Sequence, residues 1–239
     1  AGHPVVMFSY GGVAALPAGV EAASASDILP HPDTMIRHER TGSPALFSDK
    51  FRYHLLMQND GIIWSDTDAY CLRPFEPVDG YMFGRENDDL VASGVLALPA
   101  ASTALRALMD LCDDEYAIPV WMRPRHVAEI ERRAAEGDPM HVSEMPWGVW
   151  GPRALTHFLG VHDEIRYALP PHVLYPVPFG DRRIYFRGAG MTWRRVREDT
   201  VSIHFYGRRC RARLNLKHGG VPPEGSILAE LAERHGVAA

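Results

Sequence analysis

Along this chain, short apolar runs alternate with segments whose apolar residues recur at helical spacing, and this alternation constrains the fold more than any other feature. Strands are expected at residues 4–10, 62–65, 81–84, 94–98, 173–175 and 201–206, and helices at 43–59, 102–116, 125–137, 151–159 and 225–235. No internal repeat or long linker divides the chain. The pattern predicts one α/β domain over residues 1–239, with a mixed central sheet flanked by helices.

The first long helix has a recognisable beginning and a defined core face. Ser43 and Pro44 are the residue types preferred at an N-cap and at the first helical position. Phe47, Phe51 and Leu55 follow at intervals of four and should face the core. The run at 4–10 (PVVMFSY) should likewise form a buried strand, because it is apolar and ends at a glycine pair.

The sequence contains no signal for membrane insertion or disulfide chemistry. No apolar run approaches the roughly 18 to 20 residues that a bilayer span needs, and no charged leader precedes an apolar segment at the start. The cysteines Cys71, Cys112 and Cys210 are odd in number and form no C-x-x-C pair. Reduced cysteines and a cytoplasmic location are therefore expected.

The net charge of -5 conceals an uneven distribution. Residues 166–217 contain 12 basic and three acidic side chains, a charge of +9, so the remainder carries -14. All but two of the 25 basic residues are arginine, which binds phosphate and carboxylate in a bidentate manner. A solvated face combined with codon bias would explain this; the alternative is a positive surface for a nucleotide diphosphate or an acidic membrane. Nucleic acid is not an expected partner, because the basic part has no binding motif and the pI is near 6.2.

Asp66-Thr67-Asp68 directly follows the strand expected at 62–65. The strand would deliver both aspartates to the rim of a sheet, where α/β proteins bind ligands. In extended backbone, residues i and i+2 point the same way, so both carboxylates could face one divalent cation. About one D-x-D is expected by chance in this composition, and a surface turn or a helix cap remains the alternative interpretation.

Two further features are ambiguous on their own. Asp49 and Arg52 are neighbours on one helix face, which is typical of a surface ion pair but also of a pair that grips polyol hydroxyls. His204 lies in an apolar run just before Gly207 and Arg208, where it is either a core histidine or a third metal ligand. Arg208 or its neighbour Arg209 would then bind phosphate.

Several motifs occur in an order that resembles a known family. They are SDKFRY at 48–53, Gly61, Trp64 and the aspartate pair, CLRPF at 71–75, VASGVL at 91–96, WGP at 150–152, YP at 175–176 and SIHFY at 202–206. Together they resemble glycosyltransferase family 32 and its bacterial capsule-type relatives, and the pattern is also similar to that of the glucosylating clostridial toxins. The resemblance covers most of the chain.

The resemblance implies a GT-A (Rossmann-like) fold and a metal-dependent, retaining glycosyltransferase used in polysaccharide biosynthesis. The donor would be a UDP- or GDP-sugar, the acceptor a saccharide or glycolipid, and the ion Mn²⁺ or else Mg²⁺. By position, Asp66, Asp68 and His204 match the metal ligands, with Asp66 shared with the ribose, and the residues that match the donor site are Asp49, Arg52, Trp64 and Ser93. The Arg-rich C-terminal part is a further candidate for peripheral contact with the inner face of a membrane.

The sequence also departs from the family pattern. Gly61-Ile62 replaces the usual Gly-Gly, and Ser93 stands where relatives often have Asn. Residues 2–6 resemble the family's second strand, so the first strand and helix are expected to be absent, which would affect nucleotide binding and activity.

Two rival functions follow from these features. One is a nucleotide-sugar-binding protein that has lost turnover. The other is a phosphohydrolase of the haloacid dehalogenase type, which also places D-x-D after an apolar strand; Tyr70 occupies a position where that class has Thr or Val.

Overall fold

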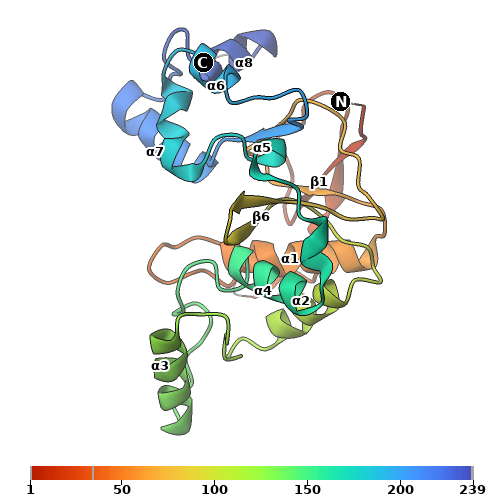
Figure 1. Ribbon diagram of the computed structural model, residues 1–239, viewed down its shortest axis with the longest axis vertical. Coiled ribbons are helices and arrows are strands. Elements are labelled where there is room, and N and C mark those ends of the chain that lie inside the picture. Colours follow the sequence, from red (N-terminus) through yellow and green to blue (C-terminus); the bar gives the residue numbers. More distant parts are fainter. Residues whose placement is uncertain (1, 34, 238–239) are drawn as a thin grey trace.

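The computed structural model describes residues 2–33 and 35–237, and the chain is a mixed α/β protein (Figure 1). Its strands are β1 (Val5–Ser9), β2 (Val20–Ser24), β3 (Trp64–Ser65), β4 (Ala69–Cys71), β5 (Met82–Asn87), β6 (Leu90–Ala97) and β7 (Ser202–His204). Its α-helices are α1 (Ala45–Gln58), α2 (Thr103–Asp113), α3 (Pro124–Ala135), α4 (Pro152–Val161), α5 (Pro171–Leu174), α6 (Gly190–Trp193), α7 (Gly207–His218) and α8 (Ile227–Arg234). Short 3₁₀ helices are η1 (Ala25–Asp27), η2 (Glu164–Tyr167) and η3 (Phe179–Phe186).

The strands form three small sheets, whereas the sequence pattern predicted one central sheet. β1 and β2 pair in parallel, β3, β6 and β5 form an antiparallel sheet in that order, and β4 pairs antiparallel with β7. β6 is the central strand of the largest sheet and is buried over Val91–Ala97. β3 adds only a short edge to this three-stranded sheet, because it pairs with β6 over two residues, Trp64 and Ser65.

Three helices cover one side of β6 and enclose the main core. Figure 1 shows α1, α2 and α4 together below β6, with α3 projecting away at the bottom. The core side chains come from these helices and from β5 and β6: Leu46, Tyr53, Leu56, Phe83, Val91, Leu96, Leu105, Leu108, Leu155 and Leu159. The Tyr53 hydroxyl donates to the Trp150 carbonyl at 2.9 Å, so the polar tip of this buried ring is satisfied.

A second core lies in the C-terminal part, at the top of Figure 1. Its buried side chains come from η3, β7, α7 and α8: Ile184, Tyr185, Phe186, Ile203, Cys210, Ile227 and Leu231. Backbone hydrogen bonds join this part to the rest, because the Val201 nitrogen donates to Val173 and the Leu72 nitrogen donates to Val201, each at 2.8 Å. The two cores are thus connected through β4 and β7.

Most expected helices are confirmed, with ends shifted by a few residues. Ser102 and Gly151 occupy the N-cap positions of α2 and α4, and the Ser102 hydroxyl accepts from the Leu105 nitrogen at 3.0 Å. At α1 the prediction was wrong by one position, because Pro44 is the N-cap and the Ser43 hydroxyl accepts from the Ala45 nitrogen. Phe47, Phe51 and Leu55 are buried as expected.

One strand prediction was wrong, and a second was right about the strand but wrong about its burial. The segment 173–175 ends helix α5 and is not a strand, because Pro170 and Pro171 fix the backbone at the start of a helical turn. The segment 4–10 does contain β1, but Val5 is 50% and Val6 44% exposed. Among the described residues β1 pairs with β2 alone, and β2 was not predicted.

Helix α7 was also missed, and a predicted loop is only partly described. The strand expected at 201–206 ends at His204, and Tyr206, with φ of 52°, turns the chain into α7. The residues of α7 (GRRCRARLNLKH) contain too few apolar side chains to give a helical period. The segment 29–41 is rich in Pro, His and Asp and is therefore expected to be a loop; it includes residue 34, which lies outside the described residues, as do 1 and 238–239.

Within the described residues, none of the helices combines the length and apolar character that crossing a lipid bilayer requires.

Glu164 is a buried carboxylate that holds the start of α2. It is 6% exposed; one oxygen accepts from the backbone nitrogens of Thr103 and Ala104 at 2.9 and 3.1 Å, and the other accepts from the Ser102 hydroxyl at 2.5 Å. Burial by itself raises the pKa of Glu164, but these hydrogen bonds outweigh burial and hold the pKa below its usual range. The carboxylate therefore stabilises the fold in its ionised form.

We expect Glu164→Gln to lower the free energy of unfolding by about 2 kcal/mol at neutral pH, because two backbone donors lose a charged acceptor. Since the folded pKa is lowered, the wild-type advantage is present above the unfolded pKa of about 4.3 and is lost as the pH falls through the folded pKa. Urea titrations across this range measure the difference. Glu131→Gln, at an exposed position of α3, is the control; an equal loss in both variants would contradict this role.

Candidate functional site

A buried arginine lies at the centre of the candidate site. Arg52, on α1, is 4% exposed and donates from Nη1 to the Ser93 carbonyl of β6 at 2.7 Å. Its Nη2 donates to Asp66 Oδ1 at 3.3 Å, and Nη1 lies 3.5 Å from Asp49 Oδ1. The guanidinium carbon stands 4.8 Å from the centre of the Trp64 ring. One side chain therefore links α1, β3, β6 and the segment after β3.

Strand pairing explains how the sequence places this cluster. Trp64 and Ser65 pair with Leu96 and Val95, and the Asp66 nitrogen continues the ladder by donating to the Gly94 carbonyl at 2.7 Å. Asp66 thereby lies beside β6, on which α1 packs. Ser93 contributes its backbone carbonyl to Arg52, so this contact does not depend on the Ser93 side chain.

Asp49 is the buried partner of Arg52 on the same helix. It is 6% exposed, and burial raises the pKa of its carboxyl to about 6, although Arg52 opposes the shift. A Cβ added at Gly151 would lie 2.7 Å from Asp49 Oδ2, so only glycine allows the start of α4 to approach this closely. The WGP motif thus serves the packing of Asp49.

The carboxylates of Asp66 and Asp68 are held by different partners. Asp66 Oδ1 accepts from the indole nitrogen of Trp64 at 2.8 Å as well as from Arg52. Asp68 Oδ2 accepts from the Gly207 nitrogen at 2.5 Å, which places a negative charge at the N-terminus of α7. A Cβ at Gly207 would lie 3.0 Å from Asp68 Oδ2. Asp68 therefore acts as a helix cap, as the alternative interpretation of D-x-D proposed, while its other oxygen faces His204.

His204 reaches the aspartates through the pairing of β4 with β7. His204 pairs with Ala69, and its Nδ1 lies 3.4 Å from Asp68 Oδ1. That nitrogen is buried and has no hydrogen-bond partner. The rings of Tyr175 and Tyr206 pack edge-on against the imidazole, at 5.6 and 4.8 Å between centroids.

Asp66, Asp68 and His204 each offer an oxygen or nitrogen within 4.8 Å of the other two. In the part of the chain that the structure describes, this is the one cluster of three or more His, Cys, Asp or Glu side chains with such spacing. The mixed oxygen and nitrogen donors are of the kinds that divalent transition metals accept.

A cavity of about 190 Å³ lies next to the cluster and shares Asp66 with it. It is lined by His38, Ala45, Leu46, Asp49, Arg52, Asp66, Ser93, Trp147, Gly148 and Pro152. The cavity is smaller than the roughly 300–1,000 Å³ of sites for drug-sized ligands. Its dimensions suit one small polar group, with charged and neutral hydrogen-bonding side chains on its wall.

Two cavity residues were missed in the sequence, His38 and Trp147. His38 is 3% exposed; its Nδ1 contacts the Thr41 hydroxyl at 3.3 Å, and its Nε2 has no hydrogen-bond partner. The Trp147 ring packs edge-on against it at 5.3 Å. Both residues lie in irregular segments without a periodic pattern. The one feature of the sequence that could have indicated a binding site was a tryptophan, Trp147, in a loop.

Arg208 does not itself line the cavity but contacts Trp147, which does. Its Nη2 donates to the Thr41 carbonyl at 3.3 Å, and its guanidinium carbon lies 5.3 Å from the centre of the Trp147 ring. The first turn of α7 is thereby joined to the loop that carries His38. Arg208 thereby braces the cavity wall, and its role in binding phosphate stays a prediction.

Comparison of the chain with protein-family models, with curated proteins and with solved structures gives no significant match in any of the three.

The raised pKa of Asp49 gives a stability test of this cluster. A carboxyl whose folded pKa is raised stabilises the fold fully below its unfolded pKa and loses that contribution as the pH rises through about 6. We therefore expect Asp49→Asn to gain free energy of unfolding relative to the wild type, by roughly 2 kcal/mol, as the pH rises from about 4 to about 7. Chemical denaturation at several pH values measures this.

Asp110→Asn, at an exposed position of α2, serves as the control and should follow the wild-type curve. A difference between Asp49→Asn and the wild type that stays constant with pH would show that Asp49 is ionised over the whole range.

Proposed function

We propose that this chain is a metal-dependent glycosyltransferase of GT-A type, which moves a sugar from a UDP- or GDP-sugar to a hydroxyl acceptor. The observation that carries the proposal is the convergence of Asp66, Asp68 and His204 beside a small cavity lined by Asp49 and Arg52. These residues match the family's motifs by position, and they come from three separate segments of the chain. Retention of anomeric configuration is carried over from the resemblance alone.

The three candidate ligands fit a divalent ion. His204 Nδ1 is a buried nitrogen without a partner, and an unsatisfied group of this kind is costly unless something binds it. Two carboxylates with one imidazole suit Mn²⁺ better than Mg²⁺, which prefers oxygen ligands. A bound ion would supply Lewis-acid stabilisation of the negative charge on a leaving diphosphate.

The chain's own residues would bind and orient the sugar. Asp49 offers carboxylate oxygens, Arg52 offers a guanidinium Nε without a hydrogen-bond partner, and His38 offers Nε2. Such fixed donors and acceptors recognise hydroxyl groups. Because Arg52 is already paired with two carboxylates, the cavity selects a neutral polyol over an anion.

No side chain of the site is assigned as a covalent nucleophile. Asp66 Oδ1 accepts hydrogen bonds from both Trp64 and Arg52, which lowers its electron density and holds it in place. The role proposed for Arg52 and Trp64 is therefore positional, because both fix the orientation of Asp66.

We expect Asp66→Asn and Asp68→Asn each to weaken Mn²⁺-dependent binding of UDP or GDP about tenfold or more, because each loses a charged ligand. Asparagine is chosen because its side-chain oxygen can still accept from Gly207 and maintain the start of α7. Calorimetric titration with and without Mn²⁺ measures the effect, with Asp110→Asn as the control.

Unchanged affinity in both variants would refute the metal assignment. Mn²⁺-dependent nucleotide binding without hydrolysis or transfer, across a panel of UDP- and GDP-sugars, would favour a binding protein over an enzyme.

A nucleotide-sugar should bind more tightly than the free nucleotide, because the cavity contacts its sugar. We expect His38→Leu to reduce this difference in affinity about tenfold, because a buried hydrogen bond of about 1.4 kcal/mol is lost. Affinity for Mn²⁺ with the free nucleotide should stay at the wild-type value. His54→Leu is a matched control, since His54 Nε2 also lacks a hydrogen-bond partner but does not line the cavity. A parallel loss for nucleotide and nucleotide-sugar would contradict this role.

A further inference from the structure

Helix α7 is strongly basic and contains no acidic residue. Five of its side chains are cationic; in sequence order they are Arg208, Arg209, Arg211, Arg213 and Lys217. No carboxylate of the described residues lies within ion-pair distance of any of them, although the rest of the chain carries the excess of acid. The charge of α7 is therefore available to an external partner.

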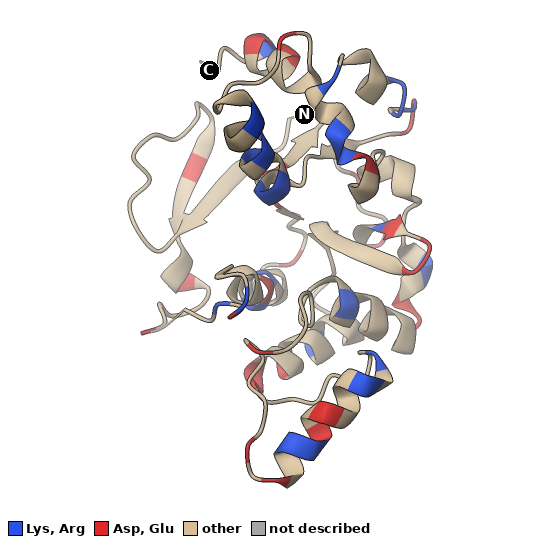
Figure 2. Cartoon of the chain, turned by 90° about the vertical axis from the view of Figure 1, so that its left-hand side faces the viewer, with Lys and Arg blue, Asp and Glu red and all other residues tan. Residues whose placement is uncertain are grey.

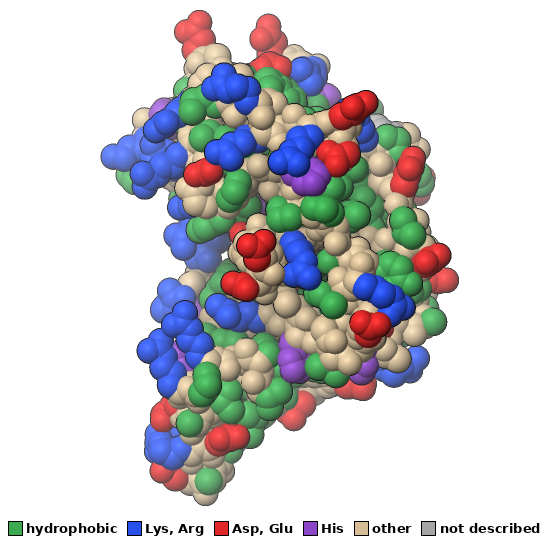
Figure 3. Space-filling view, viewed as in Figure 1, with side chains coloured by type: hydrophobic (Ala, Val, Ile, Leu, Met, Phe, Trp, Pro, Cys, Tyr) green, Lys and Arg blue, Asp and Glu red, His purple; other side chains and the backbone are tan. Residues whose placement is uncertain are grey.

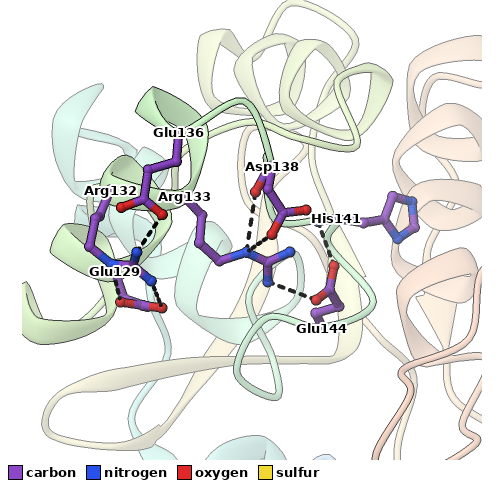
Figure 4. Close-up of polar contacts among 7 residues, drawn as sticks. All are labelled: Glu129, Arg132, Arg133, Glu136, Asp138, His141 and Glu144. Atoms are coloured by element: carbon purple, nitrogen blue, oxygen red, sulfur yellow. Dashed lines mark hydrogen bonds and ion pairs between the residues drawn. The ribbon is translucent and has the colours of Figure 1, made fainter.

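Helix α3, in contrast, contains two arginines whose charges are neutralised by neighbouring carboxylates. Arg132 pairs with Glu129 at 2.8 Å and with Glu136 at 2.5 Å, and Arg133 pairs with Asp138 and Glu144 (Figure 4). Arg132 and Arg133 are thus incorporated into a network on the helix surface. The arginines of α7 have no such carboxylate partner among the described residues.

The two sides of α7 differ in their surroundings. Cys210 is buried and Leu214 packs against the same core, so this side faces the protein. Arg209, Arg211 and Leu216 are exposed, and Leu216 has 78% of its surface in solvent. Arg208, Ala212 and Leu216 follow at intervals of four, which places them in one row on the outer side.

The outer side of α7 projects from the molecule. Figure 3 shows Lys and Arg side chains gathered at the upper left margin, where Figure 1 places α7. Figure 2, which looks onto that side, shows basic residues repeated along the helix. Two of the five are partly engaged, since Arg208 lies over Trp147 and Arg213 over Phe186. Arg209 and Arg211 are left to carry the external contact, together with Lys217, which lies in the row of Cys210 and Leu214 but is exposed near the C-terminal end of the helix.

We propose that this outer side of α7 docks on a lipid bilayer that contains anionic lipid. Arginine and lysine near an anionic surface are attracted to its headgroups, and the attraction falls off within a Debye length. The exposed Leu216, near the C-terminal end of α7, gives an apolar contact that a bilayer surface can accept. A polynucleotide is the less suitable partner, because the basic part has no nucleic-acid-binding motif.

Docking by α7 would place the candidate site at the bilayer surface. The Gly207 nitrogen, at the start of α7, is bound by Asp68, and Arg208 contacts the loop that carries His38. An acceptor hydroxyl carried on a lipid would then be near the cavity. The docking itself does not rest on the proposed function, because it depends only on the charge and exposure of α7.

The experiment is co-sedimentation of the full chain with phosphatidylcholine vesicles, with or without about 30 mol% phosphatidylglycerol. We expect binding to the anionic vesicles only, and weaker binding when salt is raised from about 0.1 M to about 0.5 M. The triple variant Arg209→Glu, Arg211→Glu, Lys217→Glu should bind about tenfold more weakly or worse.

The matched control carries the same change of charge elsewhere, as Arg106→Glu, Arg123→Glu and Arg125→Glu, all at exposed positions. It should keep most of the binding, and circular dichroism should show both triple variants folded. The proposal is overturned if the wild type ignores anionic vesicles at low salt, or if both triple variants lose binding equally. Tighter binding to a short duplex DNA than to the vesicles would also overturn it.

Discussion

The charge of Arg52, buried between α1 and β6, is the constraint on which the site depends. A guanidinium removed from water must be matched by carboxylates and carbonyls, since an unpaired buried charge costs several kcal/mol. The partners of Arg52 are Asp49 on α1, Asp66 in the segment after β3 and the backbone carbonyl of Ser93 in β6. Burial lowers the pKa of Arg52, but Asp66 and Asp49 raise it further than burial lowers it, so the guanidinium stays charged. The position of Asp66 is thereby set by the electrostatics of a core residue.

Asp68 joins the C-terminal part of the chain to the rest of the site. This carboxylate binds the first nitrogen of α7, and its backbone carbonyl accepts from the Phe205 nitrogen at 2.8 Å, so His204 is brought alongside. The same helix then turns its basic side outward. In the proposal developed above, one helix thus joins a metal site to a membrane surface, and Arg208 lies between them as a brace on the His38 loop.

Individual residues show how far sequence reasoning reached. Asp49 and Arg52 were expected to lie together because three residues separate them on a helix, and they do. The segment 173–175 looked like a strand because its side chains are apolar, but the prolines before it begin a helix. His38 and Trp147 offered no periodic pattern, since their positions are set by loop contacts such as that between His38 and Ser43. The fold is α/β, as predicted, with the strands divided among three sheets.

The sequence by itself determined what depends on neighbours along the chain: helix starts such as Ser102, the core face of α1, and the concentration of positive charge in residues 166–217. These follow from propensity, capping and periodicity, which act over a few residues. Only the tertiary structure decided the meeting of Asp66 with His204, the raised pKa of Asp49 and the unsatisfied nitrogens of His38 and His204. Burial and contact between distant segments depend on how whole elements pack, and no local pattern in the sequence carries that information.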